Sequence, residues 1–271
     1  MSYTIAITGK GGVGKTTVAG LLVARMIARG ARPVLAVDAD PNTCLDAALG
    51  VRAETTIGGV REQARAISAG AGVSKQELLG IKIAESLVEA DDFDLVAMGR
   101  PEGPGCYCYA NNVLRDTLQQ IAAAYPYVVI DNEAGLENLS RRIVQQVDLM
   151  IIVADPSRRG LDTVRRLHAL AGEMDIRWGK LAIVVNRLRA RANDPSHENL
   201  RQETGAGFLI HLADDDELAE FNERGGSYLD LPADNATSRK LDEFLSQLSI
   251  PPSQPPSPGP APAKQTEVRP Q

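Results

Sequence analysis

Nine residues near the start of the chain have the types and spacing needed to hold phosphate groups. They span 9–17 and read Gly-Lys-Gly-Gly-Val-Gly-Lys-Thr-Thr. They follow a short apolar run (3–8) and precede a segment (18–29) whose apolar residues recur at helical spacing. This order matches the G-x-x-x-x-G-K-[ST] pattern of a phosphate-binding loop, in which backbone N–H groups turn inward around phosphate oxygens. The pattern therefore predicts nucleotide binding in preference to an ordinary glycine-rich turn.

The residues of the loop are expected to have different roles in binding. Lys15 would reach the β- and γ-phosphates of the nucleotide, and the Thr16 hydroxyl would ligate Mg²⁺. The residues expected to bind ATP or ADP here are Gly11, Gly12, Val13, Gly14, Lys15, Thr16 and Thr17.

Three aspartates follow apolar runs that read as strands. Asp38 and Asp40 follow 33–37, and Asp131 follows 127–130. Carboxylates at the carboxyl ends of strands lie where open α/β sheets bind ligands. We expect Asp40 to position the attacking water, Asp131 to anchor Mg²⁺ through water, and Asp38 to help order the Mg²⁺ shell. For Asp38, capping of the following helix is a competing explanation.

Lys10 lies five residues before Lys15, and on its own it is most simply a solvated surface charge. However, the run G-K-G-G-V-G-K-T-T resembles the deviant phosphate loop of the family that contains the nitrogenase iron protein, the Min and Par positioning ATPases and metal-insertion ATPases. The resemblance implies an ATPase in which Lys10 crosses a dimer interface to the partner's nucleotide. It therefore implies a nucleotide-dependent homodimer, with Lys10, Lys15, Asp40 and Asp131 as the catalytic set.

The same resemblance extends to the base pocket. It implies that Asn186, which follows the apolar run 180–185, reads the adenine edge. The family usually has a proline where this chain has Ala213, so the resemblance leaves that wall of the pocket undefined.

A loop with two closely spaced cysteines is the most distinctive segment of the chain. Cys106 and Cys108 lie in the run G-R-P-E-G-P-G-C-Y-C-Y-A-N-N, residues 99–112. In an extended segment residues i and i+2 face the same way, so both sulfurs can point at one ion. One C-x-C supplies half of the four thiolates of a closed S₄ site, and two copies meeting across a dimer axis supply all four. Thiolates accept zinc, copper(I) and nickel, and two unliganded thiols are the alternative.

The segment M-G-R-P-E-G-P-G-C-Y-C-Y-A-N-N (98–112) resembles the loop of carbon monoxide dehydrogenase maturation ATPases, the nickel-insertion accessory proteins. The resemblance covers about 1–249. It implies an ATP-hydrolysing metallochaperone that binds Ni²⁺, or Zn²⁺ in the same site, and delivers nickel to carbon monoxide dehydrogenase. An iron–sulfur reductase component like the nitrogenase iron protein is one alternative, although no cysteine follows Asp131. A Min- or Par-like positioning ATPase is the other.

Composition narrows the class of protein. The chain has 271 residues, 44% of them hydrophobic and 24% charged, with a formal net charge of −6 and a sequence pI near 5.2. The acidic balance argues against nucleic-acid and membrane-surface partners. No charged-then-apolar leader and no long apolar run is visible, so we expect a cytoplasmic protein. Three cysteines do not make a disulfide framework, and Cys44 is expected to be a small buried residue.

Alternating strand-like and helix-like segments predict the fold. We expect a single doubly wound α/β domain of the P-loop NTPase type over 1–250, with a mainly parallel sheet and the nucleotide at the carboxyl ends of its strands. The segment 51–90 reads as a helical insertion with a short strand. The amphipathic segment 236–250 has few basic residues on its polar face, so a core-packed helix is preferred to a membrane-targeting one. The proline-rich residues 251–271 are expected to form a disordered tail.

Overall fold

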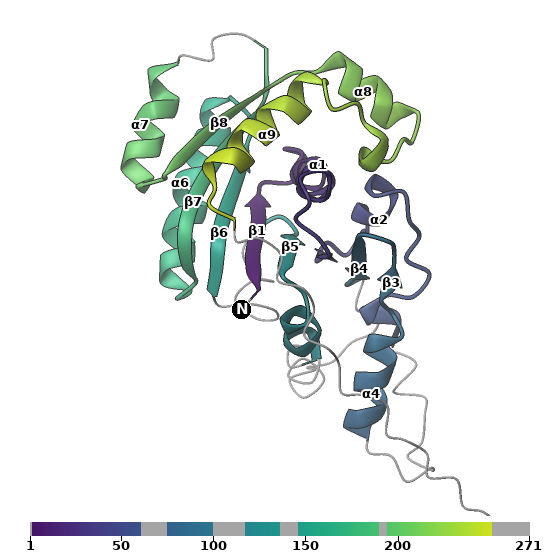
Figure 1. Cartoon of the computed structure of the whole chain (residues 1–271). Coiled ribbons are helices and arrows are strands. Elements are labelled where there is room, and N and C mark those ends of the chain that lie inside the picture. Colours follow the sequence, from purple (N-terminus) through teal and green to yellow (C-terminus); the bar gives the residue numbers. More distant parts are fainter. Residues whose placement is uncertain (1, 61–74, 100–116, 136–145, 190–193, 251–271) are drawn as a thin grey trace, which may run out of the picture.

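The computed structural model describes residues 2–60, 75–99, 117–135, 146–189 and 194–250. Its strands are β1 (Tyr3–Gly9), β2 (Val34–Asp38), β3 (Val88–Glu89), β4 (Phe93–Ala97), β5 (Tyr127–Asp131), β6 (Gln146–Ala154), β7 (Arg177–Leu188) and β8 (Phe208–Ala213). They form one sheet in the order β3-β4-β2-β5-β1-β6-β7-β8 (Figure 1). The β3–β4 pair is antiparallel and the other pairs are parallel.

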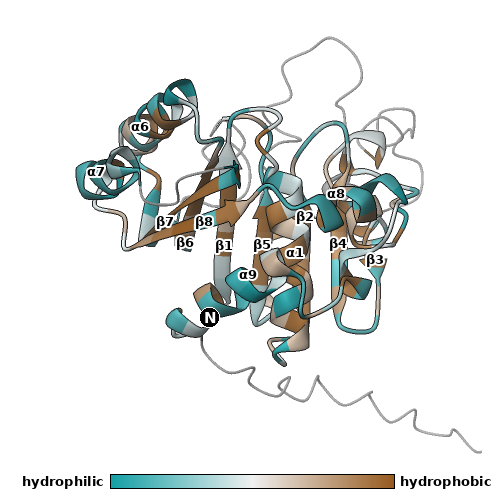
Figure 2. Ribbon diagram, turned by 90° about the horizontal axis from the view of Figure 1, so that it is seen from above, coloured by the Kyte–Doolittle hydropathy of each residue, from teal (hydrophilic) through white to brown (hydrophobic). Residues whose placement is uncertain are grey.

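Helices cover both faces of this sheet. They are α1 (Lys15–Ala28), α2 (Leu45–Ala48), α4 (Lys75–Ala84), α6 (Arg158–Glu173), α7 (Pro195–Thr204), α8 (Asp216–Glu223), the 3₁₀ helix η2 (Tyr228–Asp230) and α9 (Ala236–Gln247). Figure 2 shows α6 and α7 on one side of the hydrophobic strands and α1, α8 and α9 on the other. The doubly wound, mainly parallel fold predicted from the sequence is therefore confirmed.

The central strands are apolar throughout because both of their faces are covered. In β1, Ile5 and Ile7 face α1 and α9, whereas Ala6 points to the opposite face and joins the core beneath α6. This alternation is the period-two geometry of a strand. β1 therefore lies at the centre of the sheet, with helices on both sides, and its carboxyl end leads into the phosphate loop.

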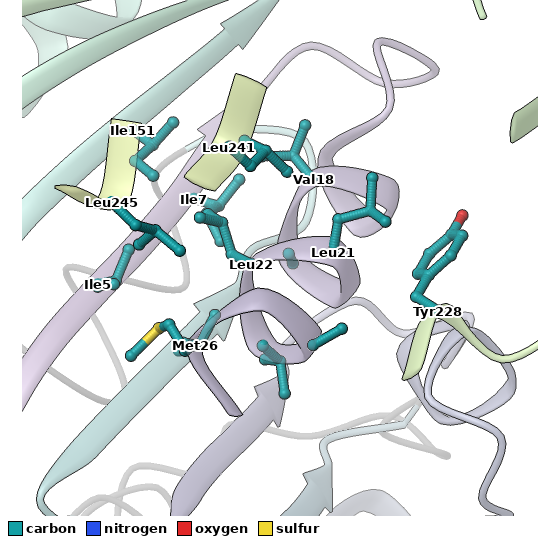
Figure 3. Close-up of a cluster of buried hydrophobic side chains, with 14 of the residues drawn as sticks. Ile5, Ile7, Val18, Leu21, Leu22, Met26, Ile151, Tyr228, Leu241 and Leu245 are labelled. Carbon is teal, nitrogen blue, oxygen red and sulfur yellow. The ribbon is translucent and has the colours of Figure 1, made fainter. Parts of the chain in front are cut away.

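Helix α9 closes the core above α1. Figure 3 shows Leu241 and Leu245 of α9 beside Leu22 of α1 and Ile5 and Ile7 of β1. Leu241 is 0% exposed. A partly buried ion pair between Arg25 of α1 and Asp242 of α9, 2.8 Å from nitrogen to oxygen, flanks this contact. The prediction of a core-packed helix is confirmed, and within the described residues no helix has the length and apolar character to cross a bilayer.

Some elements differ from the expectation. Strand β7 begins at Arg177 and continues to Leu188, beyond the predicted 180–185. Helix α7 was not predicted, although Asp194 caps it, Pro195 occupies its first turn and Gly205 ends it in the left-handed conformation. The helix α4 and the short strand β3 agree with the expected insertion. The predicted tail, 251–271, lies outside the described residues, as do Cys106 and Cys108.

Candidate nucleotide-binding site

The glycine loop follows β1, the strand at which the strand order of the sheet reverses. β1 pairs with β5 on one side and with β6 on the other, so the crossovers diverge at its carboxyl end. This is the place where open α/β sheets bind ligands. Gly12 (φ 80°) and Gly14 (φ 93°) adopt left-handed conformations that side chains disfavour, and Gly14 is the residue directly before α1. The loop thus has the backbone shape that its glycines predict.

The two lysines of the loop lie in different surroundings. Lys15 is 7% exposed, and its Nζ donates a hydrogen bond to the Lys10 carbonyl oxygen at 3.2 Å. Lys10 itself is exposed. Burial raises the pKa of Asp155, but hydrogen bonds from Ser157 and the positive charge of Lys10 outweigh it and hold that pKa below its usual value. Lys15 is therefore placed within the loop, whereas Lys10 lies at the surface and its cross-dimer contact stays a prediction.

Asp131, at the end of β5, is a buried carboxylate whose burial is only partly compensated. It is 1% exposed, and neither carboxylate oxygen has a hydrogen-bond partner in the described part of the chain. Burial raises its pKa to about 7, although the Thr16 hydroxyl and the Lys15 charge lower it in part. A buried anion left unpaired beside a hydroxyl and an ammonium group suits a hydrated Mg²⁺, so the residues fit the ion.

Asp38 has a structural environment that differs from that of Asp131. Its carboxylate is 0% exposed and accepts backbone hydrogen bonds from Asp40 (3.0 Å), Cys44 (2.8 Å) and Leu45 (2.9 Å). These bonds hold the turn between β2 and α2. These bonds agree with the explanation that Asp38 caps the following helix. A role of Asp38 in a Mg²⁺ shell stays a prediction.

Asp40 lies at the same edge of the sheet and is partly exposed. One of its carboxylate oxygens accepts bonds from the Asn42 backbone N–H (2.8 Å) and side-chain amide (3.0 Å). Because Asp38 and Asp131 are register partners on neighbouring strands, the β2 and β5 ends meet here. The water-positioning role of Asp40 is compatible with this location and stays a prediction.

Asn186 contacts the phosphate loop directly. Its Nδ2 donates to the Val13 carbonyl oxygen at 2.9 Å, and its Oδ1 accepts from the Arg187 N–H at 2.9 Å. The expected adenine-reading role stays a prediction beside this observed contact. Ala213 ends β8, and Asp215, two residues later, caps α8.

Two further residues touch the site. Arg187, which the sequence reasoning passed over, donates from Nη1 to the Gly12 carbonyl oxygen at 3.1 Å. Tyr228 of η2 approaches the Thr17 hydroxyl, with 3.4 Å between the oxygens. Neither had a sequence signal, because both reach the loop from elements distant in the chain.

The predicted thiolate site cannot be compared with the structure. Cys106 and Cys108 lie outside the described residues, and the residues that are described contain no cluster of three or more His, Cys, Asp or Glu side chains able to hold a metal. Cys44 is exposed before α2, so the expectation that it is buried was wrong. Its backbone N–H is engaged by Asp38, which leaves the thiol outside the core.

Comparison with known proteins gives the family. A family model described as an AAA domain matches residues 2–177. The chain belongs to this family. An uncharacterized ATP-binding protein of Methanocaldococcus jannaschii is 40% identical over 248 residues, covering 90% of this chain and 97% of its relative. The carbon monoxide dehydrogenase accessory protein CooC of Rhodospirillum rubrum is 30% identical over 229 residues, covering 79% and 81%.

Solved structures show the same fold. A ParA family ATPase from Chlorobium tepidum superposes with a TM-score of 0.66 at 19% identity, covering 92% of this chain and all of that one. The septum site-determining protein MinD of Pyrococcus horikoshii, solved with Mg-ADP, gives 0.59 at 19% identity, covering 91% and 97%. These solved structures share the fold of the chain, a doubly wound sheet with the phosphate loop at the end of β1.

Proposed function

We propose that this ATPase is a metallochaperone that binds nickel through Cys106 and Cys108 of two chains and inserts it into carbon monoxide dehydrogenase during maturation. The observation that carries the proposal is the C-x-C pair in a chain 30% identical to a carbon monoxide dehydrogenase accessory protein. The nickel ion is cargo here, and zinc is the ion expected to compete for the same thiolates.

The nucleotide half of the cycle uses residues that the structure brings together. Lys15 and the loop N–H groups would neutralise the β- and γ-phosphates, and Thr16 with Asp131 would hold Mg²⁺, which supplies further positive charge to the transferring phosphoryl group. Asp40 would orient the attacking water. Lys10 from the partner chain would complete the site, so hydrolysis would require the dimer.

The metal half depends on the same dimer. Each chain has two of the four thiolates that a closed site needs, and ATP would bring the two halves together. Because the coupling of two binding sites is reciprocal, nickel must alter ATP affinity by the factor by which ATP alters nickel affinity. Hydrolysis would then reopen the dimer and release the metal to the client enzyme.

The test is a nickel titration at fixed protein concentration with Mg·ATP, Mg·ADP or no nucleotide. We expect one Ni²⁺ per two chains, bound most tightly with ATP, and loss of that binding in Cys106→Ser/Cys108→Ser. Cys44→Ser is the matched control because it removes an exposed thiol outside the C-x-C. Equal nickel affinity in all three nucleotide states would refute the coupling, and nickel binding by the double variant would refute the site.

A positioning ATPase is the second candidate. Sequence similarity to MinD of Bacillus subtilis, 27% identical over 83% of this chain, favours it. The burial of Leu241, Phe244 and Leu245 in the core argues against α9 as a membrane-binding helix. Co-sedimentation of the ATP-bound protein with anionic liposomes or with DNA distinguishes the candidates. We expect the protein to bind neither liposomes nor DNA.

The iron–sulfur alternative has its own test. A brown colour in protein purified without oxygen would indicate an iron–sulfur cluster.

A further inference from the structure

The end of β7 is irregular at the point where it meets the phosphate loop. Val185 pairs with His211 and Leu188 with Ala213, so three steps along β7 match two along β8. The extra residue makes a β-bulge, and Arg187 within it has a left-handed φ of 57°. Side chains of consecutive residues in a regular strand point to opposite faces. The bulge removes this alternation and turns Asn186 and Arg187 toward the same loop.

These two side chains bind consecutive carbonyl groups of the loop. Asn186 Nδ2 donates to the Val13 oxygen at 2.9 Å, and Arg187 Nη1 donates to the Gly12 oxygen at 3.1 Å. The Arg187 N–H also donates to Asn186 Oδ1, which fixes the orientation of that amide. A side chain at Gly14 would bring its Cβ within 2.5 Å of Asn186 Nδ2, so the glycine there is needed for this close approach.

The direction of these bonds determines where the loop N–H groups point. In a trans peptide unit the C=O of one residue and the N–H of the next point in opposite directions. Holding the Gly12 oxygen on Arg187 therefore aims the Val13 N–H away from β7. Holding the Val13 oxygen on Asn186 does the same for the Gly14 N–H. Both N–H groups belong to the loop that binds phosphate.

We propose that Arg187 is a positioning residue of this ATPase. Together with Asn186 it holds the phosphate loop in its anion-binding shape before nucleotide arrives, and it acts through the Gly12 carbonyl without touching the base. The proposal predicts an effect on the polyphosphate part of the ligand alone. It rests on ATP binding and is independent of the nickel site.

The test measures binding of ATP and of inorganic tripolyphosphate, which lacks a base. Arg187→Met should weaken both about tenfold, the usual effect of losing a charged hydrogen bond. Arg187→Lys keeps a donor and should recover most of the affinity. The matched control is Arg189→Met, because Arg189 is exposed on the same segment and pairs with Asp214.

A second variant separates positioning from folding. Arg187→Gly removes the guanidinium and also the left-handed strain, so it should melt no lower than the wild type yet bind tripolyphosphate as weakly as Arg187→Met. In the nucleotide-free protein the Val13 and Gly14 amide resonances should shift in both variants. Unchanged tripolyphosphate affinity, a loss confined to ATP, or unchanged amide resonances without nucleotide would each overturn the proposal.

Discussion

At the residue scale, Asp131 shows how burial changes the protonation of a carboxylate. Its oxygens are enclosed without hydrogen-bond partners in the described residues, and its pKa is raised to about 7, chiefly by burial. An Asp in the unfolded chain titrates near 3.8. The folded protein therefore holds a proton on Asp131 in a range where the unfolded chain has lost it. Mg²⁺ would relieve this penalty by pairing with the charge.

The sign of the pH effect follows from this difference. The stability associated with protonated Asp131 is present below about pH 4 and is lost as the pH rises toward about pH 7. We expect Asp131→Asn to stabilise the nucleotide-free, Mg²⁺-free protein at pH 8 by up to about 4 kcal/mol and to change it little at pH 4. Urea unfolding of both proteins at the two pH values measures this. An equal effect at both would contradict the assignment.

The glycines of the loop provide a matched pair of substitutions. A Cβ at Gly12 would meet nothing within 4 Å, so Gly12→Ala should cost only the strain of its positive φ, about 1 kcal/mol of stability. Gly14→Ala adds a collision with the Asn186 amide and should cost about 2–4 kcal/mol and most of the ATP binding. Chemical unfolding and ATP titration of both variants test the difference. Equal costs would show that the Asn186 contact is unimportant.

Sequence reasoning reached some of these residues and not others. The phosphate loop is local, so the spacing of its glycines was enough to predict a tight turn between a strand and a helix, and the left-handed conformations of Gly12 and Gly14 are part of that turn. The surroundings of Asp38 and Asp131 could not be predicted, because both aspartates end apolar strands. In the described part of the folded chain, Asp38 has three backbone donors and Asp131 has none. Arg187 depends on a bulge that arises from pairing with β8.

At the scale of elements, α9 packs on α1 and β1, the two elements that flank the phosphate loop. Leu241 of α9 is fully buried in the core shared with α1 and β1, whereas Gln247 on the same helix is exposed. Periodicity predicted the buried face of α9. It did not predict α7, whose start depends on the Asp194 cap and Pro195 and which has few apolar residues.

This packing gives a prediction about α9. Leu241→Ala should lower the free energy of unfolding by about 2–5 kcal/mol through lost contacts and a cavity. Gln247→Ala should stay within about 0.5 kcal/mol of the wild type. Urea denaturation with circular dichroism measures both. A small effect of Leu241→Ala would mean that α9 is not an integral part of the core.

At the scale of the whole molecule, the sheet brings separate strand ends to one edge, and its order was predictable only as a class. Alternating apolar and helical segments indicated a doubly wound sheet, and the phosphate loop indicated which edge binds ligand. The sequence points to a dimer through two features, the exposed Lys10 and a C-x-C that supplies half of a closed thiolate set. The dimer therefore stays a prediction, and the two experiments below test it.

Lys10 tests the dimer through catalysis. Lys10→Ala should still bind ATP but should lower the rate of hydrolysis at least ~100-fold, because the partner's charge would be missing from the transition state. Lys82→Ala is the control, since Lys82, near the end of α4, forms a surface ion pair with Glu85, which follows the helix. The wild-type rate per chain should rise with protein concentration as dimers form. A rate independent of concentration and of Lys10 would argue for a monomeric enzyme.

Native mass spectrometry of the protein with Mg·ATP and nickel tests the central claim most directly, because it weighs the assembly and its metal together. The account predicts a species of two chains with bound nucleotide and one nickel ion, and a dimer without nickel for Cys106→Ser/Cys108→Ser. Single chains that hydrolyse ATP at the full rate, or a nickel ion retained by the double variant, would contradict it.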